Sequence, residues 1–495
     1  TFTRGSEATF VNAQGLIQST NEIGSELVTN GDFTTDSANW FLTGTSFWVN
    51  SSIEVPTGGL TQVFTLENNK TYKITFDVIQ GSGINGGVYV NTNYNSPVFA
   101  DNVGVTTTGV GGTYTFIFTM NGSGNGITLT RRVNNQDIRI DNVSVKEYTT
   151  ATNTPRLDYS TGSEAFLLEP QSTNLVTQSE DFSNVAWTKL NSTIVSSQEI
   201  SPNGSLNADR LNILTNTWLY SPSTASNGYY SVSVFAKAGD ISTFKLGISD
   251  NVQSELIINV DLSNETFTTE VGSSWTLGDA KIENYGNGWY RCSISGNNTV
   301  TSTSKLSLIR GVENGYIYIW GAQLEQNSFS TSYIPTSGAS ATRNQELCTN
   351  ATPVINSEEG TLYFEGSALA DDGTFRLLSF SDGTSVNRVY IGYSSVDKIT
   401  CSFQIASSAV YGFDFTTDIN VNSKFALKYK ENDFALWVNG VEVNSQSSGN
   451  TFPIGTLTKM QFTSGTVSSP FYGNTKDLKY YPKALADVQL QDLTT

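Results

Sequence analysis

The sequence contains no histidine, and this absence excludes several kinds of chemistry. Ser-His-Asp and Cys-His catalysis need an imidazole as the base, and His-ligated zinc needs it as a ligand. Cysteine is nearly as scarce, with three residues. Cys292 and Cys401 alternate with apolar residues and are expected inside strands, whereas Cys348 is expected as a free thiol in a linker. Three scattered cysteines form neither a disulfide framework nor a metal cluster.

Basic residues and long apolar runs are also few. The chain has 27 Lys and Arg against 45 Asp and Glu, a net charge of −18. Such a surface repels phosphate backbones and anionic lipid, so we expect no nucleic-acid partner. No apolar run approaches the ~20 residues that a membrane span needs, so we expect no membrane insertion.

The chain is instead rich in Ser, Thr, Asn and Gly, with apolar residues that alternate along short segments. Period-two alternation is clear in residues 72–78, 114–118 and 138–145, which predicts strands with one buried face. A chain of 495 residues is too long for a single core. The sequence therefore predicts several all-β domains.

Two stretches of the chain follow the same plan. Leu27–Phe33 with Trp40 matches Leu175–Phe182 with Trp187, so both tryptophans are expected in a core. Three further elements match in the same order: Tyr72/Ile74/Phe76/Val78 with Tyr230/Val232/Val234/Ala236, Tyr114/Phe116/Phe118 with Tyr290/Cys292/Ile294, and Ile138/Ile140/Val143/Val145 with Ile317/Ile319/Ala322/Leu324. Four matched elements predict two copies of one sandwich fold.

The C-terminal residues 351–495 predict a third β domain. Its clearest local signal is Asn439-Gly440, which favours a tight hairpin between apolar strands. Near the end a short helix is expected, with Leu485, Val488 and Leu493 packing it against the sheet.

Residues 151–187 carry the most specific resemblance. "Pro-Arg-Leu-Asp-Tyr … Leu-Leu-Glu-Pro-Gln-Ser-Thr-Asn-Leu … Ser-Glu-Asp-Phe-Ser … Trp" resembles a module of bacteriophage virion proteins, chiefly tail and head fibres and adhesin-like appendages. In that family the module follows a segment similar to Thr3–Ile17, and Tyr333–Arg343 is also typical of it. Because residues 23–148 separate the two halves here, we interpret them as an inserted domain.

Both repeated domains resemble the jelly rolls of carbohydrate-binding modules, through "Asn-Gly-Asp-Phe … Trp" at the opening and "Ile-Asp-Asn-Val-Ser-Val" at the close of the first copy. The chain's end resembles a concanavalin/laminin-G-like lectin sandwich. The expected fold class is therefore all-β, with two jelly-roll sandwiches followed by a lectin-like sandwich. The expected parts are a connector (1–22), an inserted jelly roll (23–148), a linker (149–172), a second jelly roll (173–335), a linker (336–350) and the lectin-like sandwich (351–495).

Exposed aromatic rings are the first candidates for a binding site, because sugars dock their apolar C–H faces on them. Most tryptophans of this chain belong to repeated core patterns, and the candidates are those less tied to such patterns. In the third domain Trp437 points to the face of its strand opposite Phe434, Leu436 and Val438, where its ring could be exposed. The alternative for Trp437 is that its ring is packed inside the domain. The candidate carbohydrate-binding residues are Trp48, Tyr89, Tyr94, Trp218, Tyr220 and Trp437.

A structural calcium ion is the second candidate, and it is implied by the resemblance to jelly-roll carbohydrate modules. The positions that match are Glu26 and Asp32 at the opening and Asp141 near the last strand. Carboxylate oxygens suit a hard cation. The alternative is that these are solvated carboxylates or a turn cap.

We expect no enzyme. Without histidine the remaining option is a glycosidase with two carboxylates, and pairs such as Asp371-Asp372 occur by chance among 45 acids. The resemblance implies a phage protein at the virion surface, which binds host-surface polysaccharide, contacts other virion proteins and forms a homo-oligomer. The alternatives are a purely structural decoration or fibre-shaft protein, and the non-catalytic modules of a secreted polysaccharide-degrading enzyme.

Overall fold

The computed structural model describes residues 1–81, 87–91, 104–106, 112–122, 124–131, 138–149, 152–224, 227–249, 254–300 and 304–495. The chain divides into two compact units. Unit 1 consists of residues 1–20 and 152–495, and unit 2 of residues 21–151. Each unit is described by itself.

Unit 2 is a β-sandwich built from alternating strands. One sheet has the order β12-β9-β14-β7-β6, with β4 also paired to β14, and the other has the order β11-β10-β13-β8-β5. The alternation brings one set of apolar side chains, including Ile74, Phe76, Ile138 and Ile140, into a single core. The strands are β4 (Glu22–Glu26), β5 (Phe41–Gly44), β6 (Phe47–Val49), β7 (Ser52–Val55), β8 (Gly58–Gln62), β9 (Thr71–Gly81), β10 (Gly87–Asn91), β11 (Gly104–Thr106), β12 (Gly112–Thr119), β13 (Ile127–Arg131) and β14 (Ile138–Thr149).

The second jelly roll belongs to unit 1, and its strands run in the order β23-β22-β21-β26-β19-β27-β20-β25-β24, with β18 paired to β19. Residues 209–213 of β19 pair with β27 and residues 218–224 with β26, so one long strand links two layers around a common core. The strands are β18 (Thr188–Ile200), β19 (Leu206–Thr224), β20 (Gly228–Ala238), β21 (Thr243–Ser249), β22 (Glu255–Asp261), β23 (Thr266–Val271), β24 (Trp275–Asn284), β25 (Trp289–Asn298), β26 (Ser304–Gly311) and β27 (Gly315–Glu325).

The two jelly rolls open in the same way. Trp40 and Trp187 are both buried, and each packs on the phenylalanine of its own motif, with ring centroids 5.3 and 4.9 Å apart. The indole N–H of Trp40 donates to the carbonyl of Asn30 at 3.0 Å, and that of Trp187 to the carbonyl of Gln178 at 2.8 Å. Asn30 and Gln178 hold matching places in the two motifs, so the sequence match is also a match of contacts.

The opening segment is tied to the closing strand at matching residues in both copies. The amide of Val143 donates to the carbonyl of Gly31 at 2.9 Å, and the amide of Ala322 donates to the carbonyl of Ser179 at 2.9 Å. Both pairs are those that the sequence alignment of the two copies predicts. Repetition of one fold is therefore visible in individual hydrogen bonds.

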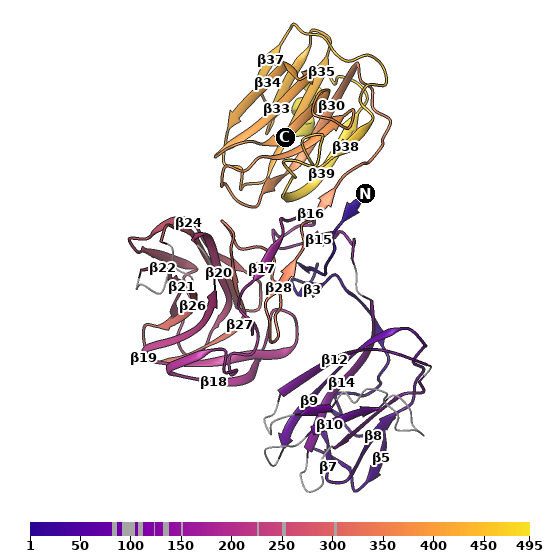
Figure 1. The fold of residues 1–495 in the computed structure, drawn as a ribbon, viewed down its shortest axis with the longest axis vertical. Coiled ribbons are helices and arrows are strands. Elements are labelled where there is room, and N and C mark those ends of the chain that lie inside the picture. Colours follow the sequence, from indigo (N-terminus) through magenta and orange to yellow (C-terminus); the bar gives the residue numbers. More distant parts are fainter. Residues whose placement is uncertain are drawn as a thin grey trace. The chain divides into compact units, whose positions relative to one another are not determined.

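The third sandwich packs a seven-stranded sheet, β15-β16-β39-β30-β35-β36-β37, on a five-stranded sheet, β34-β33-β32-β31-β38 (Figure 1). Its core includes Cys401, while Cys292 lies in the core of the second jelly roll, and both thiols are free, as predicted. Strands β30 to β39 are β30 (Glu359–Ala368), β31 (Arg376–Ser381), β32 (Arg388–Tyr393), β33 (Lys398–Ile405), β34 (Ser408–Thr416), β35 (Ser423–Lys430), β36 (Phe434–Val438), β37 (Val441–Gln446), β38 (Lys459–Gln461) and β39 (Gly473–Tyr481).

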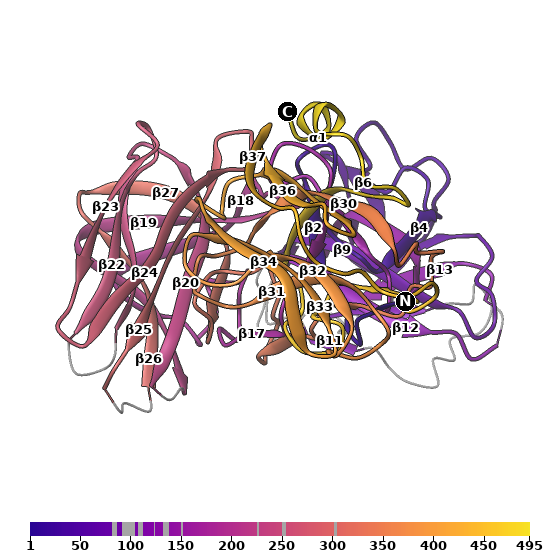
Figure 2. The same cartoon turned by 90° about the horizontal axis from the view of Figure 1, so that it is seen from above.

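Helix α1 (Asp487–Thr494) is the one helix in the part of the chain that the structure describes, and it lies beside β36 and β37 (Figure 2). Leu490 is fully buried against the sheet, and Leu485 and Leu493 pack partly against it. The prediction for Val488 is wrong, because its side chain is 67% exposed. Residues advance about 100° each along a helix, so Val488 lies roughly 200° from Leu490, on the solvent side.

Three segments of unit 1 meet one another, and we call residues 1–20, 152–174 and 326–348 the junction. Strands β15 and β16 belong to it, so residues expected as a linker contribute two strands to the C-terminal sheet. The other junction strands form two-stranded pairs, β1 with β29, β2 with β3 and β17 with β28. The junction strands are β1 (Phe2–Thr3), β2 (Thr9–Val11), β3 (Ile17–Ser19), β15 (Arg156–Asp158), β16 (Ala165–Leu168), β17 (Ser172–Asn174), β28 (Ala341–Arg343) and β29 (Leu347–Cys348).

The all-β fold class, with two jelly rolls and a lectin-like sandwich, is confirmed. In the described ranges no helix has the length and apolar character to cross a membrane.

Candidate functional site

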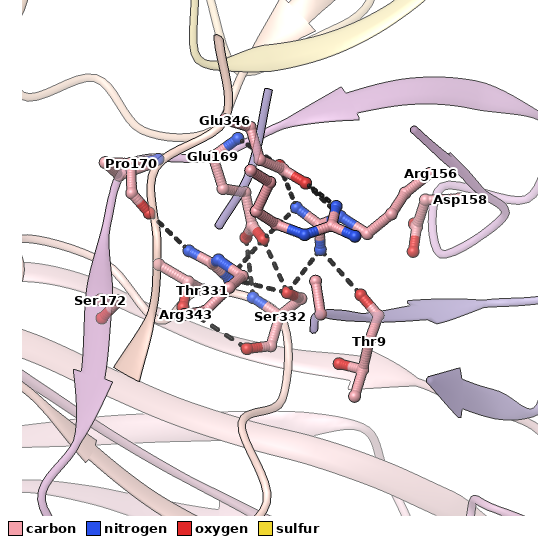
Figure 3. A network of polar contacts seen from close by, with 12 residues as sticks. Thr9, Arg156, Asp158, Glu169, Pro170, Ser172, Thr331, Ser332, Arg343 and Glu346 are labelled. Atoms are coloured by element: carbon pink, nitrogen blue, oxygen red, sulfur yellow. Dashed lines mark hydrogen bonds and ion pairs between the residues drawn. The ribbon is translucent and has the colours of Figure 1, made fainter. Parts of the chain in front are cut away.

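The junction is held by a buried network of three arginines and two glutamates. Figure 3 shows Arg156 and Arg343 of this network with Glu169 and Glu346. Arg4, Arg156 and Arg343 come from the three segments of the junction, and each directly follows a Thr or a Pro. All three side chains are almost fully buried. The motif residues that are far apart in the sequence therefore meet at one place in the fold.

Arg156 lies at the centre of this ion network. Its Nε donates to Oε1 of Glu346 at 2.8 Å, and its Nη2 donates to both Glu346 and, at 2.8 Å, Glu169. Its Nη1 donates to the carbonyl of Thr9 at 2.7 Å and to the hydroxyl of Ser332 at 2.8 Å. One guanidinium thus links all three segments of the junction.

The other two arginines complete the ion network from either side. Arg4 Nη1 donates to Oε1 of Glu346 at 2.6 Å, and Arg343 Nη1 donates to Oε2 of Glu169 at 2.6 Å. Arg343 Nη2 also donates to the carbonyl of Pro170 at 2.6 Å. Each carboxylate therefore has two arginine partners, while Arg156 is shared between them.

Electrostatics keep Glu169 ionised. Burial alone would raise the pKa of this carboxyl, but the guanidiniums of Arg343 and Arg156, with hydrogen bonds from Ser332, outweigh it and hold the pKa at about 2. Breaking a buried ion pair by removing one partner typically costs about 3–5 kcal/mol. The arrangement suits a structural clamp rather than a proton donor, and sequence reasoning missed it. The available signal was the recurrence of Thr-Arg or Pro-Arg in each motif segment.

Trp48, the candidate in unit 2, lies at the surface. Its side chain is 39% exposed, and its indole N–H donates to the carbonyl of Phe33 at 2.7 Å, which fixes the ring. Phe47, on the same strand β6, and Phe41, on strand β5 of the other sheet, are also exposed. Unit 2 therefore presents aromatic rings to solvent.

Trp218, the candidate in the second jelly roll, is half-buried and partly covered. The guanidinium carbon of Arg310, its partner on the neighbouring strand, lies 3.5 Å from the centroid of the Trp218 ring. Arg310 also pairs with Glu255, and next to it Lys245 pairs with Glu270 at 2.6 Å. A ligand could stack only on the part of Trp218 that the guanidinium leaves free.

The remaining aromatic candidates are half-buried, buried or not described by the structure. Tyr220 lies two residues beyond Trp218 on β19 and is half-buried. Trp437 faces away from the sandwich core as expected, but helix α1 covers that face and leaves Trp437 7% exposed. Tyr89 lies in β10, where its side chain is not described, and Tyr94 lies outside the described residues.

Glu26, the first expected calcium ligand, is used within the fold. Its Oε1 accepts from the amides of Val28 at 3.1 Å and Val145 at 2.8 Å, and its Oε2 accepts from the hydroxyl of Ser144 at 2.6 Å. These bonds tie the opening segment to β14.

Asp141, the expected calcium ligand near the last strand, lies close to two other carboxylates, Asp77 and Asp32. Burial raises its pKa to about 6, and the nearby charges of Asp77 and Asp32 add to this rise, against a hydrogen bond from Asn142. Asp32 itself is exposed. The described residues include no group of three His, Cys, Asp or Glu placed to hold a metal ion, and calcium stays a prediction.

Neither a protein-family model nor a curated protein sequence matches the chain. Among solved structures, Ruminococcus gnavus IT-sialidase CBM40 is similar, with 17% identity over 30% of this chain and 94% of its own, at a TM-score of 0.26. The tandem CBM22-1-CBM22-2 domain of Paenibacillus barcinonensis Xyn10C is 10% identical over 62% of this chain and 98% of its own, at a TM-score of 0.21. Mouse laminin alpha1 domains LG4-5 are 10% identical over 64% and 91%, also at 0.21.

Proposed function

We propose that this chain is a non-enzymatic surface protein of a bacteriophage virion that attaches the particle to host-surface glycans. The observation that supports adhesion is Trp48, an exposed indole whose orientation is fixed by its hydrogen bond to Phe33. A ring held in one orientation can stack on a sugar without losing further conformational freedom on binding. Many copies on one particle would turn a weak contact into avid attachment.

The virion assignment is supported by what the phage-type motifs do in the fold. Arg4, Arg156 and Arg343 are motif residues, and their buried ion network joins the second jelly roll and the third sandwich. The module thus acts as a rigid holder for binding domains. Its place is the virion surface, where its partners are other virion proteins and further copies of this chain.

A structural role is the second candidate, and one observation favours it for the second jelly roll. The Trp218 ring, which would otherwise be a sugar platform, carries the Arg310 guanidinium at 3.5 Å. Arg310 is in turn paired with Glu255. Such a charged, self-paired surface suits contact with another virion protein at least as well as contact with a sugar.

The test is binding of the labelled, multivalently presented chain to candidate host cells, with purified surface polysaccharide as competitor. Trp48→Ala should lower the affinity of one site roughly tenfold, as expected when a stacking residue worth about 1.4 kcal/mol is removed. Trp48→Phe keeps an aromatic ring but loses the hydrogen bond to the carbonyl of Phe33, so its affinity should lie between those of the wild type and Trp48→Ala.

Trp218→Ala is the matched control, because it removes an indole of the same size that Arg310 already covers. Circular dichroism and thermal unfolding would show that each variant keeps its fold. Absence of binding to any host cell in multivalent form would refute adhesion and favour the structural role. A larger loss from Trp218→Ala than from Trp48→Ala would move the site to the second jelly roll.

A further inference from the structure

The third sandwich carries an open cleft of about 420 Å³ on its five-stranded sheet. Leu377 of β31 and Tyr390 of β32 line the cleft and alternate along their strands with the core residues Leu378 and Ile391. The floor is therefore the face of the sheet that points away from the core. This volume lies within the range of small-molecule sites.

Residues 464–469 form one wall of the cleft, and Gly465 lets this segment approach the sheet closely. A Cβ at Gly465 would lie 2.7 Å from the carbonyl oxygen of Thr384, and the backbone there has a φ of +101°. Both the space and the backbone conformation favour glycine at this position. The wall is thus held against the hairpin of β31 and β32.

Arg388 is the one charged residue among the nine residues that the structure describes along the cleft. Its polar partners in the described part of the chain are Gln404 and Ser464, and neither is acidic. At physiological salt, charges more than about 8 Å away are largely screened, so the near charge matters more than the −18 of the whole chain. A cation without an acidic partner favours an anionic ligand.

The guanidinium of Arg388 is held in one orientation with one nitrogen available. Its Nε donates to Oε1 of Gln404 at 2.8 Å, and its Nη1 donates to the carbonyl of Ser464 at 2.5 Å. Its central carbon lies 4.9 Å from the centroid of the Tyr390 ring. Nη2 has no hydrogen-bond partner in the described ranges, and it is not one of the buried unpartnered atoms, so a ligand in the cleft can reach it.

Hydroxyl groups make up most of the remaining polar lining. Five of the nine lining residues are Ser or Thr. The hydroxyl of Ser468 bonds to those of Ser464 and Thr466, each at 2.7 Å, whereas the hydroxyls of Ser469 and Tyr390 are reachable and have no partner among the described residues. A hydroxyl both donates and accepts, so this lining complements the hydroxyl groups of a sugar.

An exposed aromatic ring lies at the other end of the cleft from Arg388. Arg388 pairs with Ser381 at the end of β31, whereas Phe375 directly precedes the start of β31. At about 3.3 Å per residue, the backbones of Arg388 and Phe375 are roughly 20 Å apart. Phe375 is 51% exposed and offers an apolar face to the C–H groups of a sugar ring.

We propose that this cleft binds a short segment of an acidic polysaccharide, with the carboxylate of one sugar unit on Nη2 of Arg388 and another unit on Phe375. The inference rests on the proposed glycan-binding function and names a substrate class for it. The site is separate from Trp48 and belongs to the other unit. The reachable donor, the hydroxyl-rich wall and the exposed ring together favour an acidic sugar over an acidic peptide.

The test is ligand-observed NMR titration of the full chain. The acidic probes are trigalacturonate, a hyaluronan tetrasaccharide and sialyllactose, the neutral probes are galactotriose and lactose, and hexaglutamate is the peptide probe. At least one acidic sugar should bind more tightly than both neutral probes. Arg388→Gln should weaken it about ten- to hundredfold, the value of a hydrogen bond to a charged group, and Phe375→Ala about three- to tenfold.

Lys398→Gln is the matched control, because it removes the same charge from strand β33 of the same sheet but lies outside the cleft. It should leave the affinity unchanged. Circular dichroism and thermal unfolding would show that each variant keeps its fold. If Arg388→Gln does not fold, Phe375→Ala carries the test, because its side chain is exposed.

Four results would overturn the proposal: no acidic sugar binds, a neutral probe binds as tightly as the acidic sugars, hexaglutamate binds more tightly than every sugar, or Lys398→Gln weakens binding as much as Arg388→Gln. Absence of probe binding together with attachment to host cells that depends on Trp48 would refute the cleft and leave adhesion intact. Binding of an acidic probe that depends on Arg388, without attachment to any host cell, would support the cleft and refute adhesion.

Discussion

Replacing Arg156 with methionine would remove the residue that links the three segments of the junction. The variant loses two contacts with Glu346, one with Glu169 at 2.8 Å, and the bonds to Thr9 and Ser332. Methionine fills a similar volume, so the effect reports polar contacts more than a cavity. Each glutamate keeps one arginine, Arg4 or Arg343.

The expected cost is about 1.5–3 kcal/mol in the free energy of unfolding of unit 1, the value of hydrogen bonds to charged groups, because each glutamate keeps an arginine and no buried charge is left unpaired. Urea titration followed by tryptophan fluorescence and circular dichroism would measure it. Lys245→Met is the matched control, because it breaks the more exposed ion pair with Glu270 in the same unit. An exposed pair is worth about 0–1 kcal/mol. If Arg156→Met cost no more than Lys245→Met, the clamp would carry no stability and our reasoning would be refuted.

The pH dependence gives a second view of the same network. The folded pKa of Glu169 is about 2, below the ordinary value near 4.5. Between pH 2 and 4.5 the unfolded chain therefore binds more protons than the folded chain. The stabilisation from Glu169 is present above about pH 4.5 and is lost as the pH falls towards 2. In Arg156→Met the pKa of Glu169 should rise, and the loss on acidification should become smaller. Parallel stability curves for the two proteins would contradict this account.

Two further predictions test other parts of unit 1. Burial raises the pKa of Asp209 from 3.8 to about 7, so the folded chain binds more protons than the unfolded chain between these values. The free energy of unfolding of the wild type should therefore fall by on the order of 2–4 kcal/mol as the pH rises from about 4 to 7. The urea midpoint of Asp209→Asn should lack this fall, and the same pH dependence in both proteins would contradict the assignment. Leu490→Ala should cost about 2–5 kcal/mol in thermal or urea unfolding, because Leu490 of helix α1 is fully buried against the sheet. Val488→Ala, on the exposed side of the same helix, should stay within about 0.5 kcal/mol, and equal costs would contradict the helix orientation.

Local pattern in the sequence determined the sandwiches and their duplication. Period-two alternation buries Ile74 and Phe76 in one copy and Val232 and Val234 in the other, because successive side chains of a strand point to opposite faces. The Phe-then-Trp motif determined the core places of Trp40 and Trp187, since each indole N–H donates to a carbonyl ten or nine residues earlier in the same opening segment. Such contacts are visible in the sequence because both partners lie in the same short segment.

Only the tertiary structure decided which distant residues meet. Arg4 and Glu346 are 342 positions apart, and no local pattern states that they pair. The cover that Arg310 places on Trp218 and that helix α1 places on Trp437 depends on how separate strands and the helix pack. An aromatic residue in a strand has the same sequence signature whether its outer face meets solvent, a guanidinium or a helix. Exposure of a ring and convergence of charges are properties of packing, which is why they appear only in the folded chain.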